Sequence, residues 1–151
     1  MNKTWTGGWG YLILFPSGRY VLRGGHEYES TNNRMEVTAI LEILKYIRRY
    51  ERKRNYKINI EIISDSGYAI FPFIKYNWED KWRNNQLVSS MLNYDLWSEL
   101  LPLVFCYFKN RITFTHIRGH GKNESDYYNK YNDVVDKYCV EKRINADEKK
   151  G

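Results

Sequence analysis

The run that decides the fold is Thr31-Asn32-Asn33-Arg34-Met35-Glu36, because a long helical pattern starts there. Thr31 or Asn32 can cap a helix over about 34–49, since a short polar side chain accepts hydrogen bonds from the first backbone N–H groups of a helix. Apolar residues then recur every three or four positions, which is the spacing of one buried helix face. These residues are Val37, Ile40, Leu41, Leu44 and Ile47.

A β-hairpin is predicted before this helix. Residues 9–15 form an apolar strand, Pro16-Ser17-Gly18 supplies a turn, and residues 20–23 form the returning strand. The glycines Gly7, Gly8 and Gly10 indicate close backbone approach near the first strand.

After the long helix, residues 57–63 alternate polar and apolar side chains, which predicts a strand ending at Ser64-Asp65-Ser66. A short helix through Ile74 should follow despite Pro72, and residues 76–93 form an exposed excursion. A helix over 96–108 comes next, with Asp95 as its cap and Pro102 as a kink.

The last third of the chain predicts a strand over 111–117, a glycine-bearing loop over 119–123 and a helix over 125–142. The expected buried stripe of this helix is Tyr127, Tyr131, Val134, Val135 and Tyr138. Strands and helices follow one another without repeats or a linker. A single α/β domain over 1–144 is therefore predicted, followed by a polar tail over 145–151.

The net charge of +6 and the pI near 9.2 suit a polyanionic partner such as nucleic acid. Much of this charge lies at the predicted end of the long helix. Cations there favour the helix dipole and solubility, so a solvated helix end is a better interpretation than a recognition surface. The cations are Arg48, Arg49, Arg52, Lys53 and Arg54.

Neither a membrane span nor a signal peptide is expected, because the chain has no long apolar run and no charged-then-apolar N-terminus. Cys106 and Cys139 have no partner motif and lie in apolar stretches, so they are predicted to be two buried, reduced thiols. An intracellular, cytoplasmic protein is expected, with a nuclear or virus-encoded one left open.

Three acidic residues are candidates for chemistry, and each also has an ordinary explanation. Asp65 stands at a strand end, where α/β proteins place ligands, but it could equally be the N-cap of the next helix. Glu36 could be a capping or dipole residue of a first helical turn. Asp133, one turn after Asn129, could be an ordinary surface residue.

Histidines give a weaker signal. His120 lies in a Gly-His-Gly loop after a strand, where it could move a proton or assist product release, or be only an exposed loop residue. His26 and His116 lie in or beside strands and are expected to be structural.

Together these motifs resemble the type 1 ribonucleases H. The resemblance rests on the Thr31–Glu36 run, on Asp65 between two serines, on Gly119-His120-Gly121 and on Asn129-x-x-x-Asp133. It also includes Gly7-Gly8-Trp9-Gly10 and Asn93-x-Asp95-Leu96-Trp97, so it covers residues 7 to 142.

The resemblance implies a mixed five-stranded sheet flanked by helices, and an endonuclease that hydrolyses the RNA strand of RNA/DNA hybrids. It also implies two Mg²⁺ ions, with Mn²⁺ as an alternative, and a monomer without an obligate protein partner. The implied metal ligands are Glu36, Asp65 and Asp133, and His120 is the implied mobile catalytic histidine. The implied hybrid-binding residues are Thr31, Asn32, Asn33, Lys75, Trp78, Lys81, Trp82 and Arg83.

One feature departs from the family, which carries a further Asp on a central first strand ahead of the glycine motif. No Asp precedes Asp65 in this chain, so that first strand and its carboxylate are expected to be missing. Either Met1 is an internal methionine, or the chain is a fragment or an inactive relative. Two other interpretations stay open: a module that binds hybrid or duplex without cutting it, and a detached RNase H domain of a reverse transcriptase.

Overall fold

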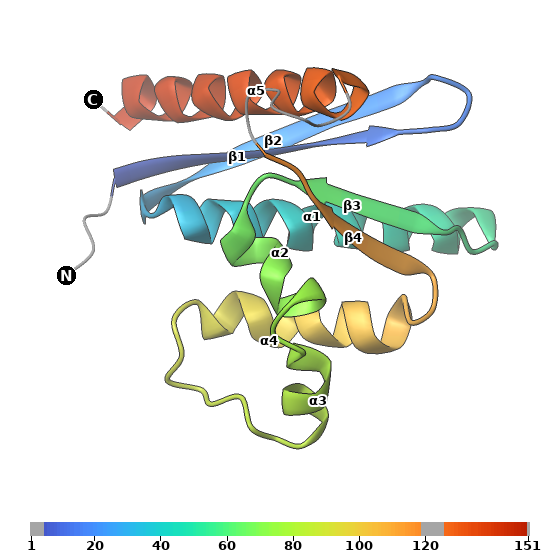
Figure 1. Ribbon diagram of the computed structural model, residues 1–151. Helices are drawn as coiled ribbons and strands as arrows, with labels where there is room; N and C mark the ends of the chain where they lie inside the picture. Colours follow the sequence, from blue (N-terminus) through green and yellow to red (C-terminus); the bar gives the residue numbers. More distant parts are fainter. Residues whose placement is uncertain (1–4, 119–125, 151) are drawn as a thin grey trace. The chain divides into compact units, whose positions relative to one another are not determined.

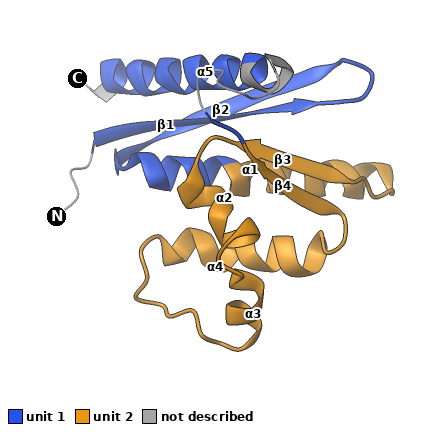
Figure 2. Ribbon diagram, viewed as in Figure 1, with its two compact units in different colours: residues 1–39, 117–151 blue, residues 40–116 orange. Residues whose placement is uncertain are grey.

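The computed structural model describes residues 5–118 and 126–150 (Figure 1). Its contacts divide the chain into two compact units, residues 1–39 with 117–151 and residues 40–116 (Figure 2). The elements in chain order are β1 (Trp5–Leu14), β2 (Tyr20–Ser30), α1 (Asn32–Arg54), β3 (Ile60–Ser64), α2 (Gly67–Ile74), α3 (Trp78–Arg83), α4 (Tyr94–Pro102), the π-helical η1 (Leu103–Tyr107), β4 (Ile112–His116) and α5 (Asp126–Lys150).

Unit 1 is built on the predicted hairpin, with β1 and β2 antiparallel and Leu14 opposite Tyr20. The expected end of the second strand at Arg23 is wrong, because β2 continues to Ser30. Gly25 makes this continuation compatible with Trp9, because a Cβ on Gly25 would lie 2.7 Å from the Trp9 ring. The missing side chain at Gly25 therefore leaves room for an indole on the strand opposite.

Helix α5 lies against the hairpin and approaches it closely at Gly8. A Cβ at Gly8 would collide with the backbone carbonyl of Cys139, so only glycine leaves room for the helix there. The expected helix end at residue 142 is wrong: α5 runs to Lys150, Ala146 is 1% exposed, and its carbonyl accepts a hydrogen bond from the Tyr28 hydroxyl at 3.2 Å. Val134, expected to be buried, is 38% exposed.

Unit 2 holds a parallel pair, β3 and β4, in which Ile60 lies opposite Ile112 and Ser64 opposite His116. The apolar face predicted for α1 is confirmed, because all five of its residues are buried. The expected start of β3 at Lys57 is wrong. Since the N–H and carbonyl of Ile58 bind side chains of Glu51 and Arg111, the ladder begins only at Ile60.

The helices of unit 2 enclose an aromatic core around Trp97 and Phe73. Asp95 was expected to cap α4, but the cap is Asn93 with φ of 60°, and Asp95 lies in the first turn. After Pro102 the chain forms a π-helical turn instead of a simple kink. A π turn breaks the 3.6-residue spacing, and Cys106 within it is exposed, contrary to the expected buried thiol. Cys139 is half-buried.

The antiparallel hairpin, the parallel pair and the flanking helices confirm the predicted α/β class. Among residues 5–118 and 126–150 the four strands form two separate pairs. The expectation of a missing central strand stays a prediction. In that same part of the chain, none of the helices combines the length and apolar character that a membrane span needs.

Candidate active site

Asp65 directly follows β3, at the carboxyl end of the parallel pair. Its backbone carbonyl lies 3.2 Å from Nε2 of His116, the last residue of β4. The Asp65 side chain is half-buried. Strand β3 and His116 on β4 thus hold the backbone of Asp65 at the carboxyl edge of the pair, which is the edge where α/β proteins place ligands.

The N-cap of α2 is Ser66, which removes the main ordinary explanation for Asp65. Ser66 has extended backbone angles, and its Oγ accepts the Ala69 N–H at 3.2 Å. The Ser66 N–H in turn donates to Oγ of Ser64 at 3.1 Å. The two serines beside Asp65 therefore order the turn, and the capping interpretation of Asp65 is wrong.

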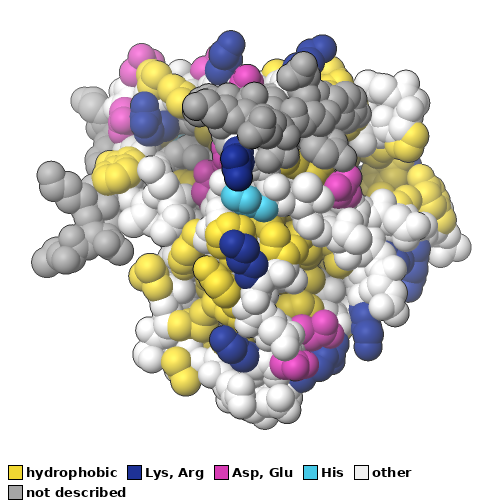
Figure 3. Space-filling model, viewed as in Figure 1, with side chains coloured by type: hydrophobic (Ala, Val, Ile, Leu, Met, Phe, Trp, Pro, Cys, Tyr) yellow, Lys and Arg dark blue, Asp and Glu magenta, His cyan; other side chains and the backbone are white. Residues whose placement is uncertain are grey.

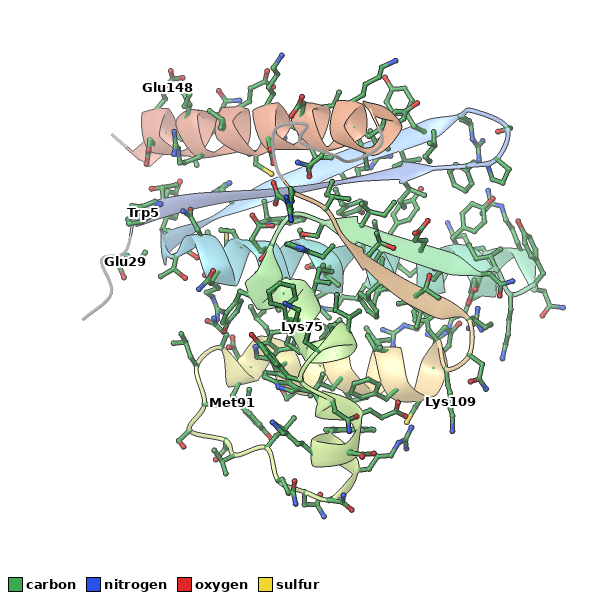
Figure 4. All side chains as sticks on the ribbon, in the orientation of Figure 1. Trp5, Glu29, Lys75, Met91, Lys109 and Glu148 are labelled. Carbon is green, nitrogen blue, oxygen red and sulfur yellow. The ribbon has the colours of Figure 1, made fainter. Side chains whose placement is uncertain are left out.

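A phenylalanine links this edge to a cation. The ring of Phe71 lies 4.8 Å from that of His116, and Nζ of Lys75 lies 4.1 Å from its centre. His116 thus has structural contacts, as expected. Lys75 is exposed (it is labelled in Figure 4). In the same orientation, Figure 3 shows Lys and Arg side chains beside a broad apolar area.

The start of α1 carries the second group of candidates. The Arg34 N–H donates to Oγ1 of Thr31 at 3.2 Å, which confirms Thr31 as a cap, and Asn32 and Asn33 are exposed. Glu36 is half-buried and lies beyond the first turn of α1, which contains no acidic residue. The interpretation of Glu36 as a first-turn capping or dipole residue is therefore wrong.

Asp133 lies within α5 and is exposed, and Asn129 belongs to the same helix. His120 lies outside the described residues. Glu36 and Asp133 belong to unit 1 and Asp65 to unit 2. Within the described ranges, no three or more His, Cys, Asp or Glu side chains lie close enough to hold one metal ion. The donor chemistry, three carboxylates, is nevertheless the kind that Mg²⁺ takes.

The predicted exposed excursion contains α3, and two of its candidate residues make packing contacts. The Trp78 ring lies 4.8 Å from that of buried Trp97, and the Trp82 ring 5.6 Å from that of Phe105. Nη2 of Arg83 donates to the Phe105 carbonyl at 2.8 Å. Lys81 is exposed. These tryptophans hold the excursion in place, and their role in binding nucleic acid stays a prediction.

Glu51 is a residue that sequence reasoning missed, hidden in a run of cations. It is 3% exposed, and its carboxylate binds Nη1 of Arg111 at 2.5 Å, the Ile58 N–H at 2.8 Å and the Tyr107 hydroxyl at 3.1 Å. Burial alone would raise the pKa of Glu51, but the bonds from Arg111, Ile58 and Tyr107 hold it below its usual value. A signal existed: Glu51 lies seven residues after Leu44, on the apolar face of α1.

Comparisons with known proteins show the family of this chain. The family model for RNase H matches residues 1–143, so the chain belongs to the RNase H family, a class of nucleases. It is 35% identical over 140 residues to a ribonuclease H of Thermoanaerobacter sp. (strain X514), with 89% of this chain and 78% of the relative covered. It is also 35% identical over 147 residues to a ribonuclease H of Rickettsia bellii, with 93% and 81% covered.

Solved structures share the fold at low identity. The RNase H domain of prototype foamy virus superposes with a TM-score of 0.61 at 16% identity, covering 94% of each chain. LC9-RNase H1, a type 1 RNase H with the type 2 active-site motif, gives 0.62 at 15% identity and covers 96% of this chain and 74% of its own. The predicted ribonuclease H fold and enzyme class are confirmed.

Proposed function

We propose that this protein hydrolyses the RNA strand of RNA/DNA hybrids as an endonuclease. The observation that carries the proposal is Asp65, placed at the carboxyl end of β3 while Ser66 caps the next helix. Membership of the RNase H family and relatives named ribonuclease H support the same activity.

Glu36, Asp65 and Asp133 would hold the divalent ions, two Mg²⁺ with Mn²⁺ as an alternative. When bound, such ions generate a nucleophile from water and stabilise the departing oxygen. This chain's own contribution is to orient the ligands: the strand end and His116 fix the backbone of Asp65, and α1 and α5 carry Glu36 and Asp133. His120 would assist turnover.

Hybrid binding is assigned to the start of α1 and to the excursion. Asn32 and Asn33 are exposed and would reach sugars and base edges, and Thr31 would meet a phosphate. The excursion residues Lys75, Trp78, Lys81, Trp82 and Arg83 would grip the DNA strand by phosphate neutralisation and stacking. We further propose an intracellular monomer.

A second candidate is a module that binds hybrid or duplex without cutting it. One observation favours it: the net charge of +6 and the exposed Asn32 and Asn33 suit contact with a polyanion, and binding alone needs no metal ligands. A detached reverse-transcriptase domain is less well supported, because this chain is 35% identical to two bacterial relatives named ribonuclease H and 16% identical to the foamy virus RNase H domain.

Cleavage of labelled RNA in a hybrid, with and without Mg²⁺, tests the proposal, and all-RNA and all-DNA duplexes are the substrate controls. Cleavage should need the metal, spare both duplexes and disappear in Asp65→Asn. The matched control is Asp147→Asn, which changes an exposed carboxylate on α5. Hybrid that is bound but left intact would favour the second candidate, and cleavage that survives Asp65→Asn would overturn the assigned site.

A further inference from the structure

The positive charge of this chain is concentrated in two short segments. Residues 48–57 and 107–111 hold eight of the 24 Lys and Arg residues but only one of the 18 Asp and Glu residues. The remainder of the chain is therefore close to neutral. The basic character of the whole protein comes from these 15 positions.

The structure joins these segments around Tyr107. The guanidinium groups of Arg48, Arg52 and Arg111 lie 5.9, 6.0 and 5.5 Å from the centre of its ring. The single acid, Glu51, is buried and bound to Arg111, so it offers no negative charge to solvent. Six cations remain exposed, here called the basic end: Arg49, Arg52, Lys53, Arg54, Lys57 and Lys109 (Lys109 is labelled in Figure 4).

The helix dipole explains only part of the basic end. Arg52, Lys53 and Arg54 lie in the last turn of α1, where cations are favoured. Arg49 precedes that turn, Lys57 follows the helix, and Lys109 belongs to another segment. Helix stability does not account for the cations at these three positions, so they need another explanation.

Aromatic rings lie among the cations. The Arg54 guanidinium lies 3.8 Å from the ring centre of Tyr50, whose ring is 6.4 Å from that of Tyr56. Tyr56 is 49% exposed. Cations that neutralise phosphates beside aromatic faces that can stack on bases are the combination found on surfaces that bind nucleic acid without sequence preference.

We propose that the basic end binds the sugar–phosphate backbone of nucleic acid as a second contact, separate from the cleavage site. The class of partner rests on the proposed function. The basic end lies near the amino end of the β3–β4 pair, because Arg111 immediately precedes β4, whereas Asp65 follows the carboxyl end of β3. At roughly 3.3 Å per residue, strands of this length separate the two ends by about 15 Å, or about four nucleotides of one strand.

The test compares two triple variants that remove the same charges. Arg49→Gln/Lys53→Gln/Lys109→Gln changes the basic end, and Lys137→Gln/Arg143→Gln/Lys149→Gln changes exposed cations on α5. Affinity of the full chain for a labelled hybrid is measured by fluorescence anisotropy in EDTA over a salt series. The basic-end variant should lose affinity about tenfold or more, and its salt slope should fall by about 2–3, near 0.9 for each lost phosphate contact. The affinity of the α5 variant should stay within about twofold of that of the unchanged chain, because this variant loses no phosphate contact.

If both variants lost affinity for the hybrid equally, the loss would be explained by net charge alone, and this result would overturn the proposal. Loss of binding to vesicles of anionic phospholipid, with hybrid binding intact, would overturn it in favour of a membrane surface. Circular dichroism establishes that both variants are folded. Binding is measured without metal and so does not depend on cleavage. If the unchanged chain never cleaves hybrid but the basic-end variant binds it less tightly, only the proposed function is refuted. A chain that cleaves hybrid while the two variants bind alike would refute only the basic end.

Discussion

At the amino end of the β3–β4 pair, the carboxylate of Glu51 is buried under an arginine, a tyrosine hydroxyl and a backbone N–H. At the carboxyl end, Asp65 is half-buried, and the helix cap beside it is supplied by Ser66. Both residues are acids next to one small parallel sheet. The contrast is between a carboxylate that is buried and paired within the fold and one that is proposed to hold metal.

The difference comes from the groups around each acid. Arg111 gives Glu51 a cationic partner and lowers the pKa of the Glu51 carboxyl, so the charge is neutralised within the protein. At Asp65 the local backbone is ordered instead by Ser64, Ser66 and His116. Changing each acid to its amide should therefore affect different properties.

The largest expected effect is on catalysis. Asp65→Asn should lower hybrid cleavage about a thousandfold or more, because metal-assisted charge stabilisation is worth several kcal/mol and each 1.36 kcal/mol is a factor of ten. Its urea midpoint should stay near that of the unchanged chain. Glu51→Gln is the matched control, with cleavage retained and the midpoint lowered. If Asp65→Asn unfolds the chain, the contrast between the two acids fails.

The next effect is on folding stability at the amino end. Arg111→Met leaves the Glu51 charge buried without its cation, which should cost about 3–5 kcal/mol of unfolding free energy in urea. The double variant with Glu51→Gln should lose less than Arg111→Met alone, since no buried charge then remains. A double variant that is less stable than Arg111→Met would contradict this account.

Acid should weaken the same contact. The pKa of Glu51 lies below its ordinary value of 4.5 in the folded chain, so its contribution is fully present above the unfolded pKa and is lost as the pH falls through the folded pKa. The difference in unfolding free energy between the unchanged chain and Glu51→Gln should be constant above pH 4.5 and should shrink below it. A difference that does not depend on pH would show that the ionised carboxylate is not what stabilises the fold.

The smallest effect concerns the cap at the carboxyl end. Ser66→Ala should cost about 1 kcal/mol of stability, because it removes the acceptor of the Ala69 N–H. Ser66→Asp keeps an acceptor and should recover most of that loss. Urea unfolding of the two variants measures both, and equal stability of Ser66→Ala and the unchanged chain would return the capping role to another residue.

Local signals explain what could be predicted from the sequence. The apolar face of α1, the hairpin turn, α2 despite Pro72 and the Thr31 cap each depend on residues within a few positions. The position of Asp65 directly after a strand was predicted for the same reason, since a strand end is a local feature. The order of the motifs was sufficient to predict the family.

Long-range contacts explain what could not be predicted. Glu51 is buried by Tyr107 and Arg111, which lie 56 and 60 residues away, so the sequence around Glu51 indicates only a charged helix end. The exposure of Cys106 depends on a π-helical turn that breaks helical periodicity. The grouping of the three acids into one site stays a prediction, because Glu36 and Asp133 belong to unit 1 and Asp65 to unit 2.

The last turns of α5 have a practical meaning for protein engineering. Ala146 fills a buried position and takes the Tyr28 hydrogen bond from the hairpin. A chain truncated after residue 144 would lose the buried Ala146 side chain, and the Tyr28 hydroxyl would lose this acceptor. Affinity tags and fusion partners therefore belong beyond Lys150, and fusions made inside the helix should yield less stable protein.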